Sequence, residues 1–168
     1  MTAPLTKPEP ALYDADFYAW TQAQAARLRA RAGEGGDIDW ENVAEEIESV
    51  GRSERKEIRS RLGVLLKHLL KWRYQPERRS DSWTEMISKQ RYHISEVIIE
   101  SPSLQHFPKE ALDWAYGWAV RDAARETGLP PALFPRLCPY AIDDVLDPDF
   151  LPDAGQDGVP SGSRPAPR

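Results

Sequence analysis

Residues 39–76 read DWENVAEEIESVGRSERKEIRSRLGVLLKHLLKWRYQP, and this stretch decides the fold. Its apolar side chains recur every three or four residues, the spacing that places them on one side of an α-helix. They form one stripe before Gly51 and a denser one after it: Trp40, Val43, Ala44, Ile47 and Val50, then Ile58, Leu62, Leu65, Leu66, Leu69, Leu70 and Trp72. Either Gly51 ends a first helix and Ser53 begins a second, or the two halves form one nearly continuous helix. The other helices are expected to pack against this stretch.

The same periodicity predicts three more helices, near residues 14–33, 82–101 and 108–128. Asp14 is the expected N-cap of the first of them. After the last helix, the segments PPALFP and PYAIDDVL predict short helical turns. Strand-like alternation is missing from the sequence. We therefore predict an all-α fold, a single helical bundle of about five main helices with short C-terminal turns.

Composition divides the chain into three parts. Residues 1–11 contain three prolines and no periodicity, so we expect a flexible arm there. Residues 12–150 are expected to form the helical-bundle domain. Residues 151–168 are rich in Pro, Gly and Ser, which predicts a disordered tail.

The make-up of the chain is that of an ordinary soluble protein, with 40% hydrophobic and 29% charged residues. No apolar run approaches the roughly 20 residues that a membrane span needs, and the N-terminus does not resemble a secretory signal. The single cysteine, Cys138, excludes an internal disulfide and a multi-cysteine zinc site. We expect a cytoplasmic protein that does not bind membranes.

The charge is distributed unevenly along the chain. The net charge is −5, yet residues 52–91 hold twelve basic and five acidic side chains. Such a segment can bind a polyanion, and Arg78 and Arg79 are its candidate basic surface. More often, acidic neighbours in the same fold offset the charge. We favour the second interpretation and do not expect nucleic acid as a partner.

Acidic and histidine side chains that flank the apolar stripes form a candidate polar site. Glu46, His68 and His93 lie on helix flanks, and Gln90 falls within an apolar stripe, where its amide must find partners. Helical bundles can hold metals with such residues, usually through a Glu-x-x-His pattern that this sequence lacks. Helical geometry also separates Glu45, Glu46 and Glu48. We therefore predict no metal, cofactor or catalytic residue, and keep these four side chains as a candidate polar site.

Several large side chains fall outside the main apolar faces of their helices. They are Tyr92, Ile99, Trp114 and Trp118. Aromatic residues are enriched at the centres of protein interfaces, so Trp114 and Trp118 form a candidate interaction surface. The alternative is that the C-terminal turns cover them as a second packing layer.

Many short motifs, in order, resemble a bacterial family named the domain of unknown function 29 family. The resemblance covers residues 12–152 and rests on the following: Tyr13-Asp14, Asp16-Phe17, Trp20, Asp39 to Asn42, Ala44 to Glu48, Gly51, Leu65-Leu66, His68 to Trp72, Gln75-Pro76, Ser101 to Leu104, Glu126 to Pro130, Phe134-Pro135, Cys138-Pro139 and Leu146 to Phe150. It implies a helical fold and bacterial origin. It carries no established activity, and it draws attention to Glu45, Glu46, Glu48 and His68.

Together these observations predict a small helical protein that acts as a non-enzymatic protein-interaction or regulatory module. Its partner is another protein or a second copy of the chain. Two alternatives remain: a metal-binding bundle with a Glu/His site, and nucleic-acid binding through residues 52–91.

Overall fold

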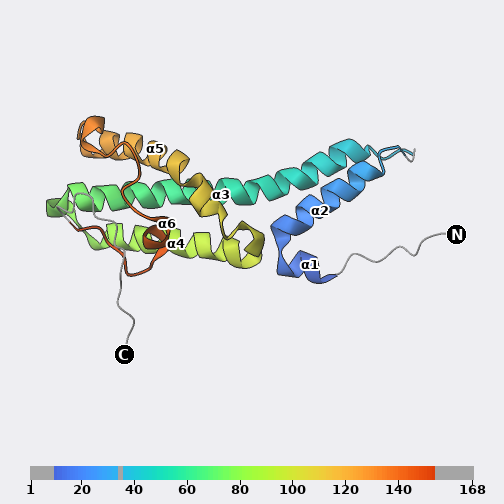
Figure 1. Ribbon diagram of the computed structural model, residues 1–168, viewed down its shortest axis with the longest axis horizontal. Coiled ribbons are helices and arrows are strands. Elements are labelled where there is room, and N and C mark those ends of the chain that lie inside the picture. Colours follow the sequence, from blue (N-terminus) through green and yellow to red (C-terminus); the bar gives the residue numbers. More distant parts are fainter. Residues whose placement is uncertain (1–9, 34–35, 154–168) are drawn as a thin grey trace, which may run out of the picture. The chain divides into compact units, whose positions relative to one another are not determined.

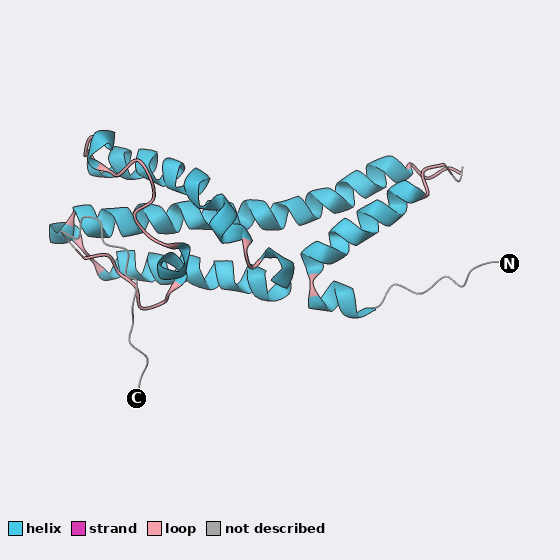
Figure 2. Ribbon diagram, viewed as in Figure 1, coloured by secondary structure: helices cyan, strands magenta, loops and turns pink. Residues whose placement is uncertain are grey.

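The computed structural model describes residues 10–33 and 36–153, and this part of the chain is helical without any strand (Figures 1 and 2). The α-helices and 3₁₀ turns, in chain order, are α1 (Pro10–Ala15), α2 (Phe17–Ala30), α3 (Trp40–Tyr74), η1 (Pro76–Arg78), α4 (Asp81–Glu100), η2 (Pro102–Leu104), α5 (Phe107–Thr127), η3 (Pro131–Leu133) and α6 (Ile142–Leu146). The prediction of an all-α fold is confirmed. So are the short helical turns after α5, which form η3 and α6.

Helix α3 continues through Gly51 without a break (Figure 1), so the second of the two alternatives for this stretch is correct. Gly51 serves packing instead of helix termination. A Cβ atom at this position would collide with Oγ1 of Thr21 on α2, and it would lie 3.0 Å from Nε2 of Gln22. The missing side chain therefore lets α2 approach the backbone of α3.

Contacts among the helices group the residues into two compact units. The first comprises the described parts of residues 1–58 and 95–107, and the second comprises 59–94 and the described part of 108–168. Helices α3 and α4 each contribute residues to both units.

Asp16 organises the first unit. Its carboxylate accepts a hydrogen bond from the backbone N–H of Ala19 (2.8 Å) and so caps α2. It also accepts bonds from the N–H and the hydroxyl of Ser103 (2.7 and 2.9 Å). The expectation that Asp14 caps this helix is wrong, because Asp14 lies inside α1. A separate short helix precedes the cap, which the run of helix-compatible residues concealed.

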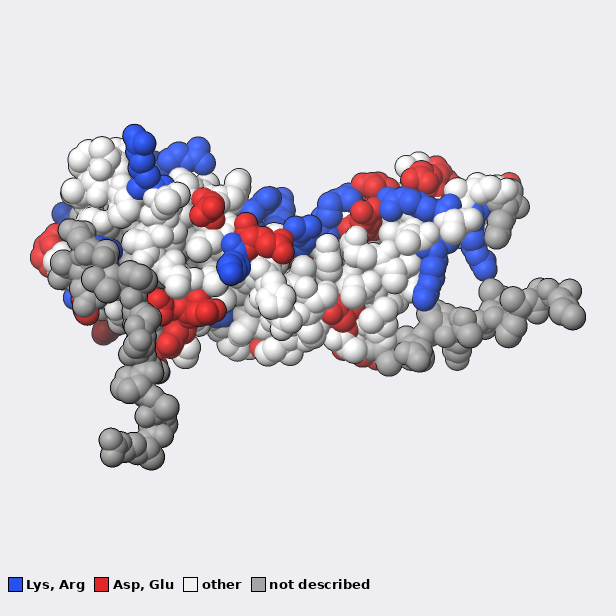
Figure 3. Space-filling view, in the orientation of Figure 1, with Lys and Arg blue, Asp and Glu red and all other residues white. Residues whose placement is uncertain are grey.

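Arg29 offsets the acidic run of α3 in the first unit. Its guanidinium forms ion pairs with Glu41 and Glu45 (both 3.2 Å) and with Glu48 (2.5 Å). Arg52 pairs with the other oxygen of Glu45. Figure 3 shows acidic and basic side chains interleaved along α2 and α3. The negative charge of the EEIE segment is thus offset mainly by Arg29 of α2. The basic residues that follow Gly51 offset only part of it, through Arg52.

The core of the second unit is built on the second half of α3. Its five leucines, Leu62, Leu65, Leu66, Leu69 and Leu70, are fully buried, as the stripe predicts. Full burial of one leucine contributes about 1.5–3 kcal/mol, so these residues supply much of the stabilisation of this unit. Ile87 and Ile94 of α4 and the alanines of α5 are buried in the same unit.

Arg91 on α4 holds the segment that follows α5. It is buried, and its guanidinium donates hydrogen bonds to the backbone carbonyls of Val145 (2.9 Å), Pro148 (3.2 Å) and Phe150 (2.8 Å). Burial lowers the pKa of Arg91, and the nearby carboxylates of Asp147 and Asp149 act in the opposite sense. One side chain therefore satisfies three carbonyls at the end of α6 and beyond it.

The expected flexible arm at residues 1–11 falls mostly on residues 1–9, outside the described residues, and α1 already begins at Pro10. Most of the expected tail, residues 154–168, also lies outside them. Within residues 10–33 and 36–153, none of the helices combines the length and apolarity that crossing a membrane requires.

Candidate interaction surface

Four side chains share one side of α5: Trp114, Trp118, Arg121 and Arg125. Their spacing of four, three and four residues keeps them on one face of an α-helix. A second face of α5, roughly 110° further round the helix, is made of buried alanines, Ala111, Ala115, Ala119 and Ala123. These small residues allow close packing against the rest of the second unit, while the large side chains remain on the other face. We call those four the tryptophan–arginine surface.

Trp114 is 52% exposed, and a cation holds its ring in place. The guanidinium carbon of Arg59, on α3, lies 4.4 Å from the centre of the ring. A cation–π contact at an exposed site contributes about 0.5–1 kcal/mol. Arg59 therefore lies against one face of the ring and leaves about half of the side chain exposed.

Trp118 is half-buried and packs against a glycine of α3. A Cβ atom at Gly63 would lie 2.8 Å from Cε3 of this indole, closer than such contacts allow. Gly63 thus provides the space into which the ring fits. Beside the ring, an open groove of about 380 Å³ is lined by Trp118, Arg121, Asp122 and Arg125.

The groove has an excess of positive charge. Asp122, with a side chain only 14% exposed, pairs with Arg125 (2.5 Å) and lies 3.9 Å from Nζ of Lys67. Arg125 itself remains 74% exposed. Arg121 is exposed and has no ion pair within the part of the chain that the structure describes. Basic side chains accordingly gather over α5 on the face that Figure 3 shows.

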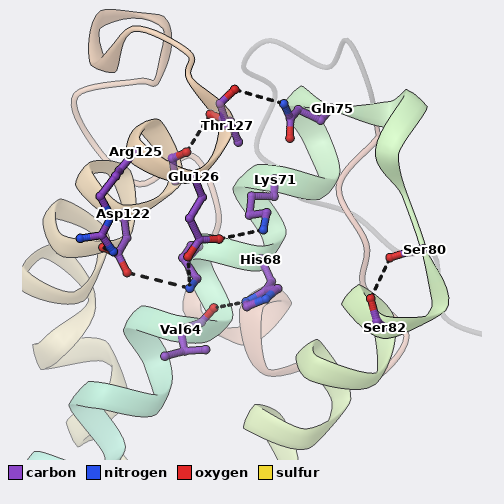
Figure 4. Close-up of polar contacts among 12 residues, drawn as sticks. Val64, His68, Lys71, Gln75, Ser80, Ser82, Asp122, Arg125, Glu126 and Thr127 are labelled. Carbon is purple, nitrogen blue, oxygen red and sulfur yellow. Dashed lines mark hydrogen bonds and ion pairs between the residues drawn. The ribbon is translucent and has the colours of Figure 1, made fainter.

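Glu126 anchors α5 to α3 next to the groove (Figure 4). It accepts hydrogen bonds from Nζ of Lys67 (2.7 Å) and from Nζ of Lys71 (2.8 Å). Partial burial alone would raise the pKa of Glu126, but the bonds from the two lysines outweigh it and lower the pKa to about 2. Lys71 also lies 4.7 Å from the ring centre of Trp83, on α4. One carboxylate and two lysines therefore join three helices of the second unit.

The candidate polar site does not bring its members to one place. Glu46 is exposed and belongs to the first unit, whereas the other three residues belong to the second. Gln90 is buried and finds the partners that its position requires: Arg61 donates to its carbonyl (3.3 Å), and its amide contacts the sulfur of Met86 (3.1 Å). His93 is half-buried, with its ring 5.6 Å from that of Tyr92. Among the described residues, no group of three or more His, Cys, Asp and Glu side chains is arranged to hold a metal ion.

His68 is buried on α3 and is bonded within its own helix (Figure 4). Its Nδ1 lies 2.8 Å from the carbonyl oxygen of Val64, so Nδ1 carries the proton that it donates. Burial lowers the pKa of His68, and the cations of Lys67 and Lys71 lower it further, against the opposing effects of the Val64 bond and Glu126. The imidazole is held neutral as part of the core boundary.

We expect His68 to make the stability of the second unit depend on pH. Because its pKa is lower in the folded chain, the unfolded chain takes up the proton first, near pH 6.5. The stabilisation that comes from the neutral His68 is complete above that pH, and it is lost as the pH falls toward the pKa of His68 in the folded chain. Urea unfolding between pH 7.5 and 5 should therefore show a steeper loss for the wild type than for His68→Asn, whose amide can still donate to Val64. The exposed His106 gives the control, and equal slopes for His68→Asn and wild type would contradict the assignment.

Of the two arginines proposed as a basic surface, only Arg78 is exposed. Arg79 donates from Nε to the carbonyl of Trp72 (2.9 Å), and its guanidinium lies 4.8 Å from the centre of the Trp72 ring. Arg79 therefore fixes the turn after α3. The sequence pattern did not identify Arg121 and Arg125, which lie outside the basic segment, although their spacing from Trp118 was a usable signal.

Cys138 lies in the segment between η3 and α6 and is half-buried. Burial raises the pKa of its thiol to about 11, against the opposing effect of the Tyr140 backbone. The thiol donates a hydrogen bond to the carbonyl oxygen of Tyr140 (3.5 Å). The thiol is thus a packing element between Leu137 and Pro139.

These features define an all-α protein that presents tryptophan and arginine side chains on one outer helix face. It is similar to an α-helical protein of unknown function from Rhodospirillum rubrum ATCC 11170, known from a crystal structure. The two sequences are 29% identical, the match covers 82% of this chain and 90% of that one, and the TM-score is 0.65. No curated protein matches the chain. The chain belongs to the family described as domain of unknown function DUF29, whose model matches residues 12–151, and this confirms the resemblance inferred from the sequence motifs.

Proposed function

We propose that this protein is a non-enzymatic protein-interaction module and that its partner binds the tryptophan–arginine surface of α5. The observation that carries the proposal is the exposed Trp114, with its ring held by Arg59, one helical turn from Trp118 and its groove. Tryptophan and arginine are the residue types that most often dominate binding energy at protein interfaces.

The rigidity of the surface supports the same proposal. Trp118 is fixed against Gly63, and Glu126 ties α5 to Lys67 and Lys71. Binding to side chains that are already ordered loses less conformational entropy than binding to mobile ones. A partner would thus meet two tryptophans that already have packing contacts, on a helix that is joined to α3.

The partner is either another protein or a second copy of the chain, and the first measurement separates the two. Light scattering over a range of concentrations reports self-association of the purified full-length chain. Affinity capture followed by mass spectrometry identifies other proteins, each of which is then purified and titrated against the chain. A chain that stays monomeric and yields no partner in such titrations would contradict the proposal.

The decisive variant is Trp114→Ala. We expect it to weaken the binding of the purified partner, or of the second copy, by a factor of ten or more, which is about 1.4 kcal/mol or more. Leu133→Ala is the matched control, because Leu133 is exposed to a similar degree, at 48%, and lies outside α5. Equal losses in the two variants, or none in Trp114→Ala, would show that the partner binds elsewhere.

A further inference from the structure

We infer that the tryptophan–arginine surface recognises an acidic peptide segment, with two carboxylates bound to Arg121 and Arg125 and an apolar side chain against the indoles. This inference rests on the proposed function and specifies the chemistry of the partner.

The charges around the groove support an anionic ligand. Its two nearby carboxylates are already engaged, since Asp122 interacts with Arg125 and Lys67, and Glu126 is held by Lys67 and Lys71. Two lysines of α3 thus offset two acids of α5. The groove keeps an excess of positive charge, because Arg121 has no ion pair among the described residues and Arg125, although paired with Asp122, is 74% exposed.

The spacing of the two arginines sets the spacing of the ligand's acids. Arg121 and Arg125 are four residues apart, which is a rise of about 6 Å along the helix. In an extended peptide, side chains two residues apart point the same way and are separated by about 6.6 Å. A Glu-x-Glu sequence in extended conformation therefore matches the pair, and arginine can bind each carboxylate through two N–H groups.

The neighbouring residues give the peptide a direction. Trp118 precedes Arg121 by three residues, so an apolar side chain next to the acids would meet the indole. Further toward the N-terminus of α5, Asp113 and Glu110 are exposed near Trp114. The ligand's acidic end thus lies over Arg121 and Arg125, and its apolar end lies toward Trp114. The apolar side chain that would meet the indole is supplied by a peptide and not by a nucleic-acid backbone, which favours the peptide.

The experiment is a fluorescence titration of the full-length chain with a labelled twelve-residue peptide that contains one Leu followed by Glu-x-Glu. Measurements at low and at physiological salt should show binding that weakens as salt rises. We expect binding at least fivefold weaker when each Glu of the peptide is replaced by Gln, and likewise when its Leu is replaced by Ala. A single-stranded oligonucleotide of similar charge is the competing probe. If the oligonucleotide binds and the acidic peptide does not, the inference is overturned.

The variants of the chain locate the site. Arg121→Glu should weaken peptide binding at least tenfold, and Arg121→Gln less. Arg78→Glu makes the same change in net charge at an exposed arginine outside α5 and should have little effect. Equal losses in Arg121→Glu and Arg78→Glu would mean that only overall charge matters, which contradicts a site at the groove.

The same variants distinguish failure of this inference from failure of the proposed function. The purified partner, or the second copy, is titrated against Trp114→Ala and against Arg121→Glu. Weaker binding of the partner to both variants supports the two proposals together. Loss in Trp114→Ala alone overturns the acidic-peptide inference and leaves the interaction surface in place. No loss in either variant overturns both proposals.

Discussion

Replacing Arg91 by alanine is expected to lower the free energy of unfolding by about 3 kcal/mol. The substitution removes three charge-assisted hydrogen bonds at once and leaves the carbonyls of Val145, Pro148 and Phe150 without their donor. Hydrogen bonds to a charged group contribute about 1.5–3 kcal/mol each, and water that reaches the freed carbonyls recovers part of the loss. Urea denaturation measures the change.

Limited proteolysis adds a local measurement to the Arg91 experiment. In Arg91→Ala, the segment from η3 through Phe150 should be cleaved before the long helices, because the three bonds join it to α4. Lys89→Ala is the control, since Lys89 is an exposed residue on the same helix and its loss should change stability by less than about 0.5 kcal/mol. If Arg91→Ala unfolds at the urea concentration of the wild type, the segment is held by other contacts.

Gly51→Ala is expected to destabilise the first unit by about 1–3 kcal/mol, although alanine favours helices. The new Cβ atom would collide with Thr21 Oγ1 and force α2 away from α3. A Thr21→Ala background removes Oγ1, the atom in the closest contact, so the cost of Gly51→Ala should fall by at least about 1 kcal/mol in a double-mutant cycle. Urea unfolding of the four proteins measures the coupling.

Gly117→Ala provides the matched control for that cycle. Gly117 lies within α5, is exposed, and has nothing within 4 Å of the position that a Cβ would take. Alanine should therefore stabilise α5 by about 0.5–1 kcal/mol through helix propensity alone. A Gly51→Ala variant as stable as this one would show that α2 does not approach α3 through Gly51.

Gly51 and Gly63 illustrate how far the sequence could predict the fold. The leucine stripe of α3 identified its buried face, because period and composition agree there, and the all-α class followed. The role of Gly51 could not be assigned from the sequence. The same local sequence is compatible with a glycine that ends a helix and with one that makes room for a neighbouring helix. Only the position of Thr21, thirty residues earlier, decides between them. The space that Gly63 provides for Trp118 depends on a partner still farther away in the chain.

The candidate surface was predictable in part for the same reason. Trp114 and Trp118 stood out because they fall outside the apolar face of α5. Arg121 and Arg125 could not be recognised in this way, because two arginines in an acidic region suggest only that they neutralise nearby carboxylates. The deciding fact is that Lys67 and Lys71 take up the neighbouring carboxylates, a contact between α3 and α5 that periodicity does not encode. Similarly, the pairing of Arg29 with Glu48 joins different helices and could not be deduced from either one.

The environment of Cys138 has a practical consequence for following motion in this protein. A thiol whose pKa is near 11 reacts slowly with alkylating reagents at neutral pH, because the thiolate is the reactive form. Exposure of the segment to water would return the thiol toward its ordinary pKa and raise the alkylation rate. Since Cys138 is the only cysteine, that rate reports one site in the whole chain. The native sequence thus contains its own chemical probe for transient opening of the segment that Arg91 secures.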